Sequence, residues 1–252
     1  MVMKVDLNSD MGEGFGPWRM GDDAALLDVI TSANIACGFH AGDPDVMAQT
    51  MRLAAKNGVG IGAHPGFADL KGFGRRRLNI GAEELGNLIA YQLGAAEGMA
   101  RSVGAEVRHF KLHGALANMC AEDAALAKTC YSAALRVNPD IILMVLAETA
   151  QQAVVEELGA NWAGEIFADR AYEDDATLVD RSKAGAVLHD ADMAAERILN
   201  MLREDAIIAE SGKRIAAKID TICLHGDTPE AVEMARALRT KLSAAGVTLT
   251  QF

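Results

Sequence analysis

The stretch VDLNSDMGEGFG, residues 5–16, joins a short apolar run to polar side chains and then to three alternate glycines. Its apolar start has the length of a β-strand, and the polar residues mark where that strand ends. Two interpretations arise at once. The glycines are typical of a loop that holds phosphate, whereas Asn8, Asp10 and Glu13 are typical of a catalytic rim. The features of the rest of the chain favour one of the two.

Seven apolar runs of strand length alternate along the chain with segments of helical period. The runs are apolar throughout, as expected when both faces of a parallel strand are buried. Two helix starts are well marked, because Asp43 and Thr228 each stand as a capping residue before a proline. We expect strands at residues 3–7, 33–37, 59–63, 107–112, 141–146, 163–168 and 219–224, and helices at residues 23–31, 44–57, 82–103, 121–137, 149–158, 192–210 and 229–245.

About seven βα units without a linker predict an α/β fold: a single TIM-like (β/α)7 barrel over residues 1–252. A doubly wound open sheet is the alternative, because the alternation of strands and helices does not reveal closure. Two connections, residues 64–80 and 169–190, are long enough to be functional covers at the rim.

Charge and composition exclude several classes of function. The 252 residues carry a formal net charge of −11, and such a chain repels nucleic acid and anionic membranes. The first ten residues lack the apolar core of a signal peptide, and we find no apolar run long enough to cross a bilayer. Four cysteines without CxxC spacing predict reduced, buried thiols. We therefore expect a cytoplasmic protein that binds neither nucleic acid nor membrane.

Polar residues gather just past the predicted strands. Four of the six histidines follow a strand and lie within two residues of a glycine. In a parallel barrel the carboxyl ends of all strands open on one face, where the active site is built. We expect the following residues to share this rim: Asp10, Glu13, His40, Asp43, His64, Lys111, His113, Asp169, Arg170, Tyr172, His225 and Asp227. Within this set we interpret Asp43 and Asp227 as helix caps. The other two histidines, His109 and His189, are interpreted as structural.

Two chemistries fit this rim, and the spacing leaves both open. Asp10 with His40, His64 or His113 can ligate a divalent metal ion, and the first three are the leading candidates, since imidazole and carboxylate suit zinc and similar ions. Without a metal, the same groups serve as general acid and base, because histidine titrates near neutral pH. For Cys37 and Cys223 we expect burial and not a nucleophilic role.

The nucleotide interpretation of residues 5–16 is weak. The chain contains no G-x-x-x-x-G-K-[ST] sequence, and GEGFG lacks the GxGxxG order. Pro17, Trp18 and Arg19 also separate the glycines from the next helix start. These features favour the catalytic rim.

Six blocks in order make the chain resemble the LamB/YcsF family. They are VDLNSDMGEGFG, ANIACGFHAGDP, GAHPGF, KLHGALAN, EIFADRAYEDDATLVDRS and ICLHGDTPEAV. The resemblance runs from about Val5 to Ala231. The chain departs from the family pattern at Ala117 and at Ala176, where tyrosine and glycine respectively are usual, and both departures concern loop packing.

The resemblance implies a seven-stranded barrel similar to that of the glycoside hydrolase/deacetylase superfamily. It also implies the role of the A subunit in an ATP-dependent 5-oxoprolinase, which converts 5-oxo-L-proline, ATP and water to L-glutamate, ADP and phosphate. Two further subunits, B and C, are implied as partners. ATP would be a co-substrate bound mainly by those partners, which agrees with the missing P-loop.

On this basis we assign hypothetical roles to the rim. Asp10 would be general base or metal ligand, and His64 and His113 would polarise the developing oxyanion or shuttle the proton. Lys111 and Arg170 are candidates for binding the substrate carboxylate or phosphate. Asn8, Glu13, His40 and His225 complete the predicted substrate-binding set.

Two alternatives come from other classes of function. One is a stand-alone, metal-dependent deacetylase or amidohydrolase of the same barrel superfamily, and the other is a non-catalytic binding subunit. The convergence of so many titratable groups argues against the second. A homodimer is the largest self-assembly that we expect.

Overall fold

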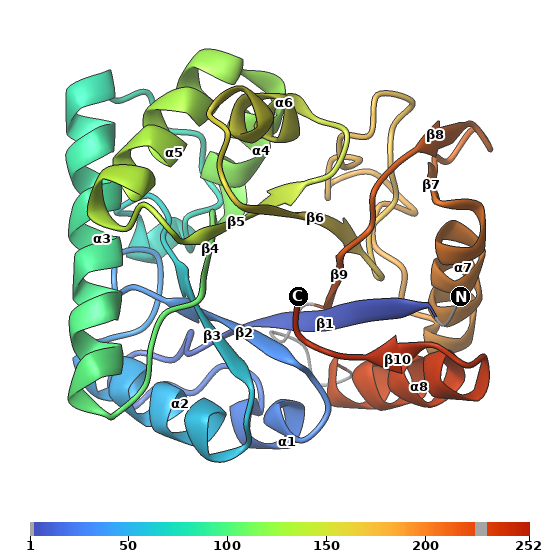
Figure 1. The fold of residues 1–252 in the computed structure, drawn as a ribbon, viewed down its shortest axis with the longest axis horizontal. Helices are drawn as coiled ribbons and strands as arrows, with labels where there is room; N and C mark the ends of the chain where they lie inside the picture. Colours follow the sequence, from blue (N-terminus) through green and yellow to red (C-terminus); the bar gives the residue numbers. More distant parts are fainter. Residues whose placement is uncertain (1–2, 225–230) are drawn as a thin grey trace.

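The computed structural model describes residues 3–224 and 231–252, and seven parallel strands close into a barrel (Figure 1). Each strand pairs with the next, and β1 pairs with β9 in register from Asp6–Thr221 to Ser9–Leu224. This last pairing closes the sheet, so the barrel prediction is confirmed and the open sheet is excluded. The barrel strands are β1 (Lys4–Met11), β2 (Ser32–Ala36), β3 (Gly60–His64), β4 (His109–Lys111), β5 (Ile142–Leu146), β6 (Trp162–Phe167) and β9 (Thr221–Leu224).

Helices surround the barrel and bury the outward face of its strands (Figure 1). Phe110 on β4 and Ile166 on β6 have no exposed surface, nor does Leu93 on α3, and all three belong to one hydrophobic core. Asp43 caps its helix as predicted, accepting hydrogen bonds from the backbone N–H groups of Asp45 and Val46. The helices are α1 (Asp23–Leu27), α2 (Pro44–Lys56), α3 (Ala82–Ser102), α4 (Gly114–Glu122), α5 (Ala124–Val137), α6 (Ala150–Glu157), α7 (Ala191–Glu204) and α8 (Ala231–Ala244).

Some predicted bounds were wrong, each for a local reason. The helix expected at residues 121–137 begins at Ala124, because the carboxylate of Asp123 caps it by accepting from the backbone N–H groups of Ala125 and Leu126. The helix that precedes it, α4, was not predicted. The helix expected to run to residue 210 ends at Glu204, since Asp205 adopts a left-handed conformation with φ 46°. The hairpin of β7 (Ala206–Ile208) and β8 (Arg214–Ala216) follows. A 3-10 turn, η1 (Leu70–Gly72), and β10 (Thr248–Leu249), which pairs with β1, were also not predicted.

The inside of the barrel is polar, contrary to the expectation of strands that are apolar on both faces. β1 continues to Met11, and its alternate residues Asp6, Asn8 and Asp10 all bond to side chains of neighbouring strands. Asp6 accepts hydrogen bonds from the hydroxyls of Thr31 and Ser32, and burial raises its pKa despite these bonds. The barrel interior is therefore a hydrogen-bonded network and not a second hydrophobic core.

Space for this network depends on small residues. A Cβ atom at Gly62 of β3 would overlap the ring of His109, which lies inside the barrel from β4. His109 is buried, and its Nε2–H donates to the side-chain oxygen of Asn34 at 2.8 Å. Glycine at position 62 is thus required by packing.

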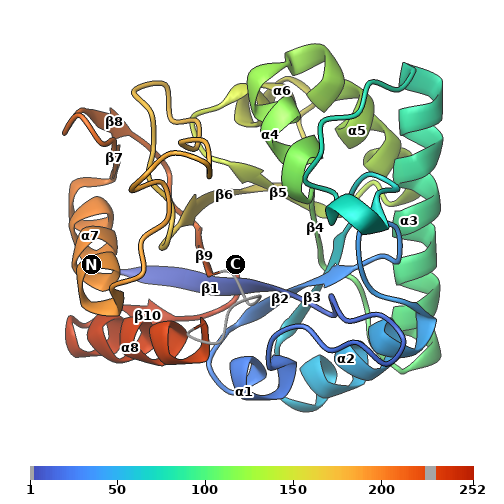
Figure 2. The same ribbon diagram turned by 180° about the vertical axis from the view of Figure 1, so that it is seen from behind.

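Both long connections lie on the same side of the barrel (Figure 2). The connection after β3 carries η1, and the connection after β6 is held together by Arg170. The guanidinium of Arg170 donates to the backbone oxygens of Val179 at 2.6 Å and Ala186 at 3.3 Å. In the described ranges, no helix is long and apolar enough to cross a membrane.

Candidate active site

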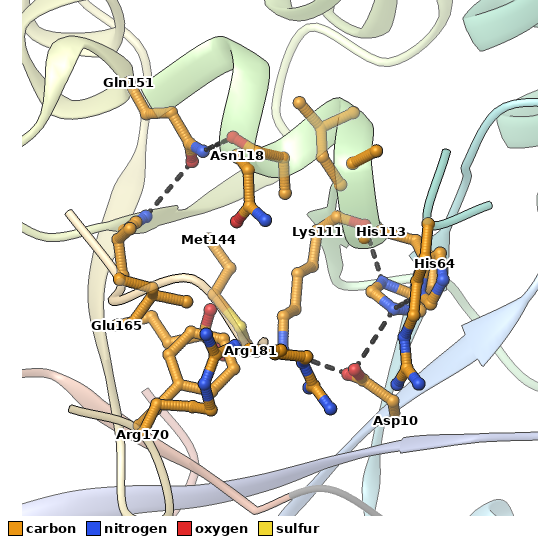
Figure 3. A pocket seen from close by; sticks show the side chains of 18 of the residues that line it. Asp10, His64, Lys111, His113, Asn118, Met144, Gln151, Glu165, Arg170 and Arg181 are labelled. Atoms are coloured by element: carbon orange, nitrogen blue, oxygen red, sulfur yellow. Dashed lines mark hydrogen bonds and ion pairs between the residues drawn. The ribbon is translucent and has the colours of Figure 1, made fainter. Parts of the chain in front are cut away.

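A cavity of about 380 Å³ opens at the carboxyl ends of the barrel strands (Figure 3). Its walls come from β1, β3, β4, β5 and β6, from the first turns of α4 and α6, and from both long connections. The polar and charged residues that line it are Asp10, His64, Arg75, Arg77, Lys111, His113, Asn118, Gln151, Glu165, Arg170, Asp180 and Arg181. The chain thus concentrates ionisable groups at the face where barrel enzymes carry out chemistry.

Lys111 lies at the floor of this cavity between two carboxylates. Its Nζ is 2.9 Å from Asp10 Oδ1 and 2.7 Å from Glu165 Oε1. Burial disfavours the ammonium, but the two carboxylates outweigh burial and hold the pKa of Lys111 well above its usual value. Lys111 is therefore a fixed positive charge. Burial also raises the pKa of the neighbouring Cys223 thiol, which lies 3.1 Å from Nζ.

Asp10 is held in place from below. Its Oδ1 accepts a hydrogen bond from the side-chain amide of Asn34 at 2.9 Å as well as the bond from Lys111. Asn34 is itself fixed by His109. The other carboxylate oxygen, Oδ2, faces His64 Nε2 at 3.3 Å. One oxygen of Asp10 is thus used for positioning and the other is directed at the histidines.

His64 and His113 face each other with their acceptor nitrogens. His64 Nδ1 lies 2.8 Å from the backbone oxygen of Lys111, and His113 Nε2 lies 2.8 Å from the backbone oxygen of Phe73. A carbonyl oxygen only accepts, so both of these nitrogens carry the hydrogen. In neutral rings the lone pairs of His64 Nε2 and His113 Nδ1 then point at each other across 3.0 Å. Two lone pairs at this distance repel unless a cation lies between or beside them.

His40 and Glu13 complete the group. The ring of His40 stacks on that of His113 with centroids 3.7 Å apart, and neither of its nitrogens makes a hydrogen bond within the described ranges. Burial lowers the pKa of both rings well below the usual value, helped in each case by neighbouring histidines. Glu13 Oε1 lies 3.6 Å from His40 Nε2 and 3.8 Å from His113 Nδ1.

The four residues Glu13, His40, His64 and His113 form a group that could hold a metal ion, with ligand atoms all within 4.8 Å of one another. Tetrahedral zinc with bonds of about 2.0–2.1 Å places its ligand atoms roughly 3.4 Å apart, and the observed separations of 3.0 and 3.8 Å bracket that value. Two of the imidazoles also donate their outer N–H to backbone carbonyls, as metal-bound histidines do. Gly74 packs against this group, where a Cβ would come within 2.7 Å of His40 Cβ.

The structure brings most of the predicted rim together. Asp10, His64, Lys111 and His113 line the cavity, and Glu13 and His40 lie behind it. Asn8 is fully buried and does not line the cavity, since it bonds to Thr221 and Asn34 inside the barrel. Arg170 lines the cavity while its guanidinium holds the loop after β6. His225 and Asp227 lie outside the described residues.

Several residues of the site were not predicted. Asn34 and Glu165 lie within strands, whereas the predicted rim, apart from Lys111, took in residues that follow strands. Period-2 spacing from the strand ends was the missed signal, because inward positions alternate. Arg75 and Arg181 lie in the two long connections, where no periodicity marks an inward side chain.

Fold and site define a parallel (β/α) barrel with a carboxylate, a lysine and a histidine cluster at its catalytic face. The chain belongs to the LamB/YcsF family, whose model matches residues 5–252. A protein from Ruegeria pomeroyi described as the A subunit of 5-oxoprolinase is 66% identical over 251 residues, covering 100% of this chain and 99% of the relative.

Two solved structures extend the comparison. The crystal structure of a lactam utilization protein from Thermus thermophilus is 39% identical, with a TM-score of 0.93 over 99% of this chain and 100% of that one. A family 4 carbohydrate esterase from Streptomyces lividans shares the fold at 12% identity, with a TM-score of 0.51 over 98% of this chain and 91% of that one.

Proposed function

We propose that this chain is the A subunit of an ATP-dependent 5-oxoprolinase, a hydrolase that opens the lactam ring of 5-oxo-L-proline to give L-glutamate. The relative named as the A subunit of 5-oxoprolinase and the neighbour named as a lactam utilization protein support this assignment. The observation that carries it is the convergence of Asp10, Lys111, His64 and His113 on one cavity. We further propose that the protein acts in the cytoplasm, which agrees with its four free, buried cysteines.

ATP has a clear chemical role in this reaction. A five-membered lactam is a resonance-stabilised amide with little strain, so its hydrolysis is unfavourable. Phosphorylation of the carbonyl oxygen makes the ring carbon electrophilic. After water adds to that carbon, the C–N bond breaks and leaves an acyl phosphate, whose hydrolysis by a second water releases glutamate and phosphate. We assign ATP binding to two partner subunits, B and C, because this chain has no P-loop sequence. This chain then receives the activated lactam and directs water to it.

The side chains of the cavity suit these steps. Asp10 acts as general base toward water, with Lys111 and Asn34 holding its carboxylate in one orientation. Lys111 is a fixed positive charge in the cavity and stabilises negative charge that develops on oxygen. Asp10, once it has taken a proton from water, returns that proton to the ring nitrogen. The site-facing nitrogens of His64 and His113 carry lone pairs and are left to hold the metal ion proposed below. Anionic groups of the substrate meet a cationic wall of Arg75, Arg77 and Arg181. Arg170 orders that wall by holding the loop that carries Arg181.

We also propose that a divalent metal ion, most simply zinc, binds to Glu13, His40, His64 and His113. The facing lone pairs of His64 and His113 support a cation at this point, and the unbonded nitrogens of His40 support a further ligand. When bound, such an ion supplies Lewis acidity at the carbonyl. Asp10 then remains next to the metal group, with Oδ2 facing His64.

Direct metal titration tests this part of the proposal. The metal-free chain should take up one equivalent of Zn²⁺ by calorimetry, and His113→Ala should weaken uptake by at least tenfold. His109→Gln is the matched control, because His109 is a buried barrel histidine outside the group. Absence of Zn²⁺ uptake by the wild type would refute the metal site. It would mean that a proton, and not a metal ion, lies between the facing nitrogens of His64 and His113.

Reconstitution with the partner subunits tests the function. Glutamate and ADP are measured together for wild type, Asp10→Asn and a control, Asp45→Asn, whose carboxylate is exposed at the start of α2. We expect Asp10→Asn to lower glutamate formation by about 10²-fold or more, while ADP is still released and the control is unaffected. Normal glutamate formation by Asp10→Asn would refute the assignment.

The stand-alone deacetylase or amidohydrolase is the second candidate. It is favoured by the histidine and glutamate group and by the fold shared with the carbohydrate esterase. It predicts zinc-dependent hydrolysis of N-acetyl substrates by the isolated chain without ATP. Glutamate formation that requires both ATP and the partner subunits would exclude it.

A further inference from the structure

Exposed apolar side chains gather on one face beside the site. Of the six large hydrophobic residues that are strongly exposed in the described ranges, four line a single hollow of about 320 Å³. Trp18 is 71% exposed, Leu70 is 50% exposed, and Phe15 and Met20 are each 40% exposed. We call these four residues the Trp18 face. An apolar patch of this kind marks a binding surface in a folded protein.

Hydrogen bonds fix the turn that carries Phe15 and Trp18 before anything binds. Phe15 and Trp18 exchange two backbone hydrogen bonds, of 2.9 and 3.0 Å, across a tight turn. The backbone N–H of Gly16 in that turn donates to Asp43 Oδ2 at 2.7 Å. A partner therefore meets a pre-formed surface and does not have to order a loop.

The hollow lies beside the proposed active site. Its inner wall is formed by Glu13 and His40, two members of the metal-type group. A partner on the Trp18 face would thus lie within one layer of side chains of the reacting groups. The same surface continues toward Phe39 and Tyr91, whose rings stack 5.4 Å apart, because Leu70 and Lys71 line both this hollow and the neighbouring one that Phe39 lines.

The charges around the hollow indicate which kind of partner protein binds there. The chain as a whole carries −11, yet the exposed ionisable residues that line the hollow, Arg19 and Lys71, are both cationic. The hollow suits a partner with an apolar centre and a rim of aspartate and glutamate. A second copy of this chain fits less well, since two strongly acidic proteins repel each other.

We infer that the Trp18 face is the docking surface for the partner subunit that delivers the activated lactam. This inference rests on the proposed function. An O-phosphorylated lactam is short-lived in water, so the subunit that makes it has to lie next to the subunit that opens it. Trp18, the most exposed residue of the face, is of the kind that dominates binding energy at interfaces.

Binding between the purified chain and its purified partner subunits tests the inference by calorimetry. Trp18→Ser should raise the Kd at least tenfold, whereas Met193→Ser, which removes a side chain 65% exposed on α7, should leave it unchanged. Arg19→Glu should weaken binding and reduce its dependence on salt. At saturating partner concentration the Trp18→Ser complex should recover wild-type turnover, because Trp18 does not belong to the catalytic machinery.

Each result has a distinct meaning. Equal affinity of the wild type and Trp18→Ser would overturn the docking surface, and so would absence of any binding by the wild type. Dimerisation of the chain alone that is lost in Trp18→Ser would assign the face to a second copy instead. Binding that depends on Trp18 without glutamate formation would leave the docking surface standing and refute the proposed function.

Discussion

His109→Gln should make the stability of the protein less sensitive to acid. Burial, together with the positive charge of Lys111, lowers the pKa of His109 to about 3, whereas an unfolded histidine titrates near 6.5. Once the pH falls below about 6.5, this histidine therefore binds a proton in the unfolded chain and stays neutral in the folded chain. The folded state loses stability as the pH falls from there toward 3.

The size of the effect follows from the two pKa values. Between pH 7 and pH 5 the unfolded histidine becomes protonated while folded His109 stays neutral, so the free energy of unfolding falls by about 2 kcal/mol. For a chain of this length the loss corresponds to a melting temperature lower by about 4 °C. Glutamine does not titrate, and its side-chain amide can still donate to Asn34.

Thermal or denaturant unfolding of wild type and His109→Gln at pH 7 and pH 5 measures this contribution. Other titrating groups are common to both proteins and cancel in the difference between the two pH dependences. A constant offset from the substitution also cancels. Identical pH dependence of the two proteins would refute the argument, because it would mean that His109 is able to protonate within the fold.

Three further predictions concern the support of the site. Asn34→Ala removes the hydrogen bond to Asp10 and leaves His109 without its acceptor. We therefore expect kcat to fall more than tenfold with little change in KM, and the free energy of unfolding to fall by about 1–3 kcal/mol. Steady-state kinetics and thermal unfolding of one preparation measure the two effects. Gly62→Ala should lower the free energy of unfolding by about 1–3 kcal/mol or more, because the added methyl group overpacks against the His109 ring. A melting temperature equal to that of the wild type would contradict this. Arg170→Met releases the backbone oxygens of Val179 and Ala186, so limited proteolysis should cut residues 169–190 faster than in the wild type.

The architecture could be predicted because the outer face of every strand is strongly apolar. Phe110 and Ile166 gave clear strand signals whatever lay on the other face. The predicted ends of the strands were less accurate, because hydrophobicity does not detect strand residues whose side chains are polar and point inward. A prediction based on hydrophobicity stopped β1 at Leu7, although the strand continues to Met11 through inward polar side chains.

The site was only partly predictable from the sequence. Histidines next to glycines after strands indicated His40, His64 and His113, since βα loops carry such residues to one face. Which of them point at one another depends on barrel curvature and on second contacts, such as the carbonyl of Phe73 that orients His113. Glu165 could not be found by a search of loops, because it reaches Lys111 from within β6.

Because the barrel interior is polar, the two faces of each strand have different roles. The outer face supplies the cohesion of the molecule, and residues there can be exchanged for others of similar volume at modest cost. The inner face is one connected framework from Asp6 at the entrance of β1 to Asp10 at its exit, so a change at any member is transmitted to the reacting carboxylate. An engineer who wishes to make this protein more heat-resistant should therefore redesign the layer between strands and helices and leave the lumen untouched.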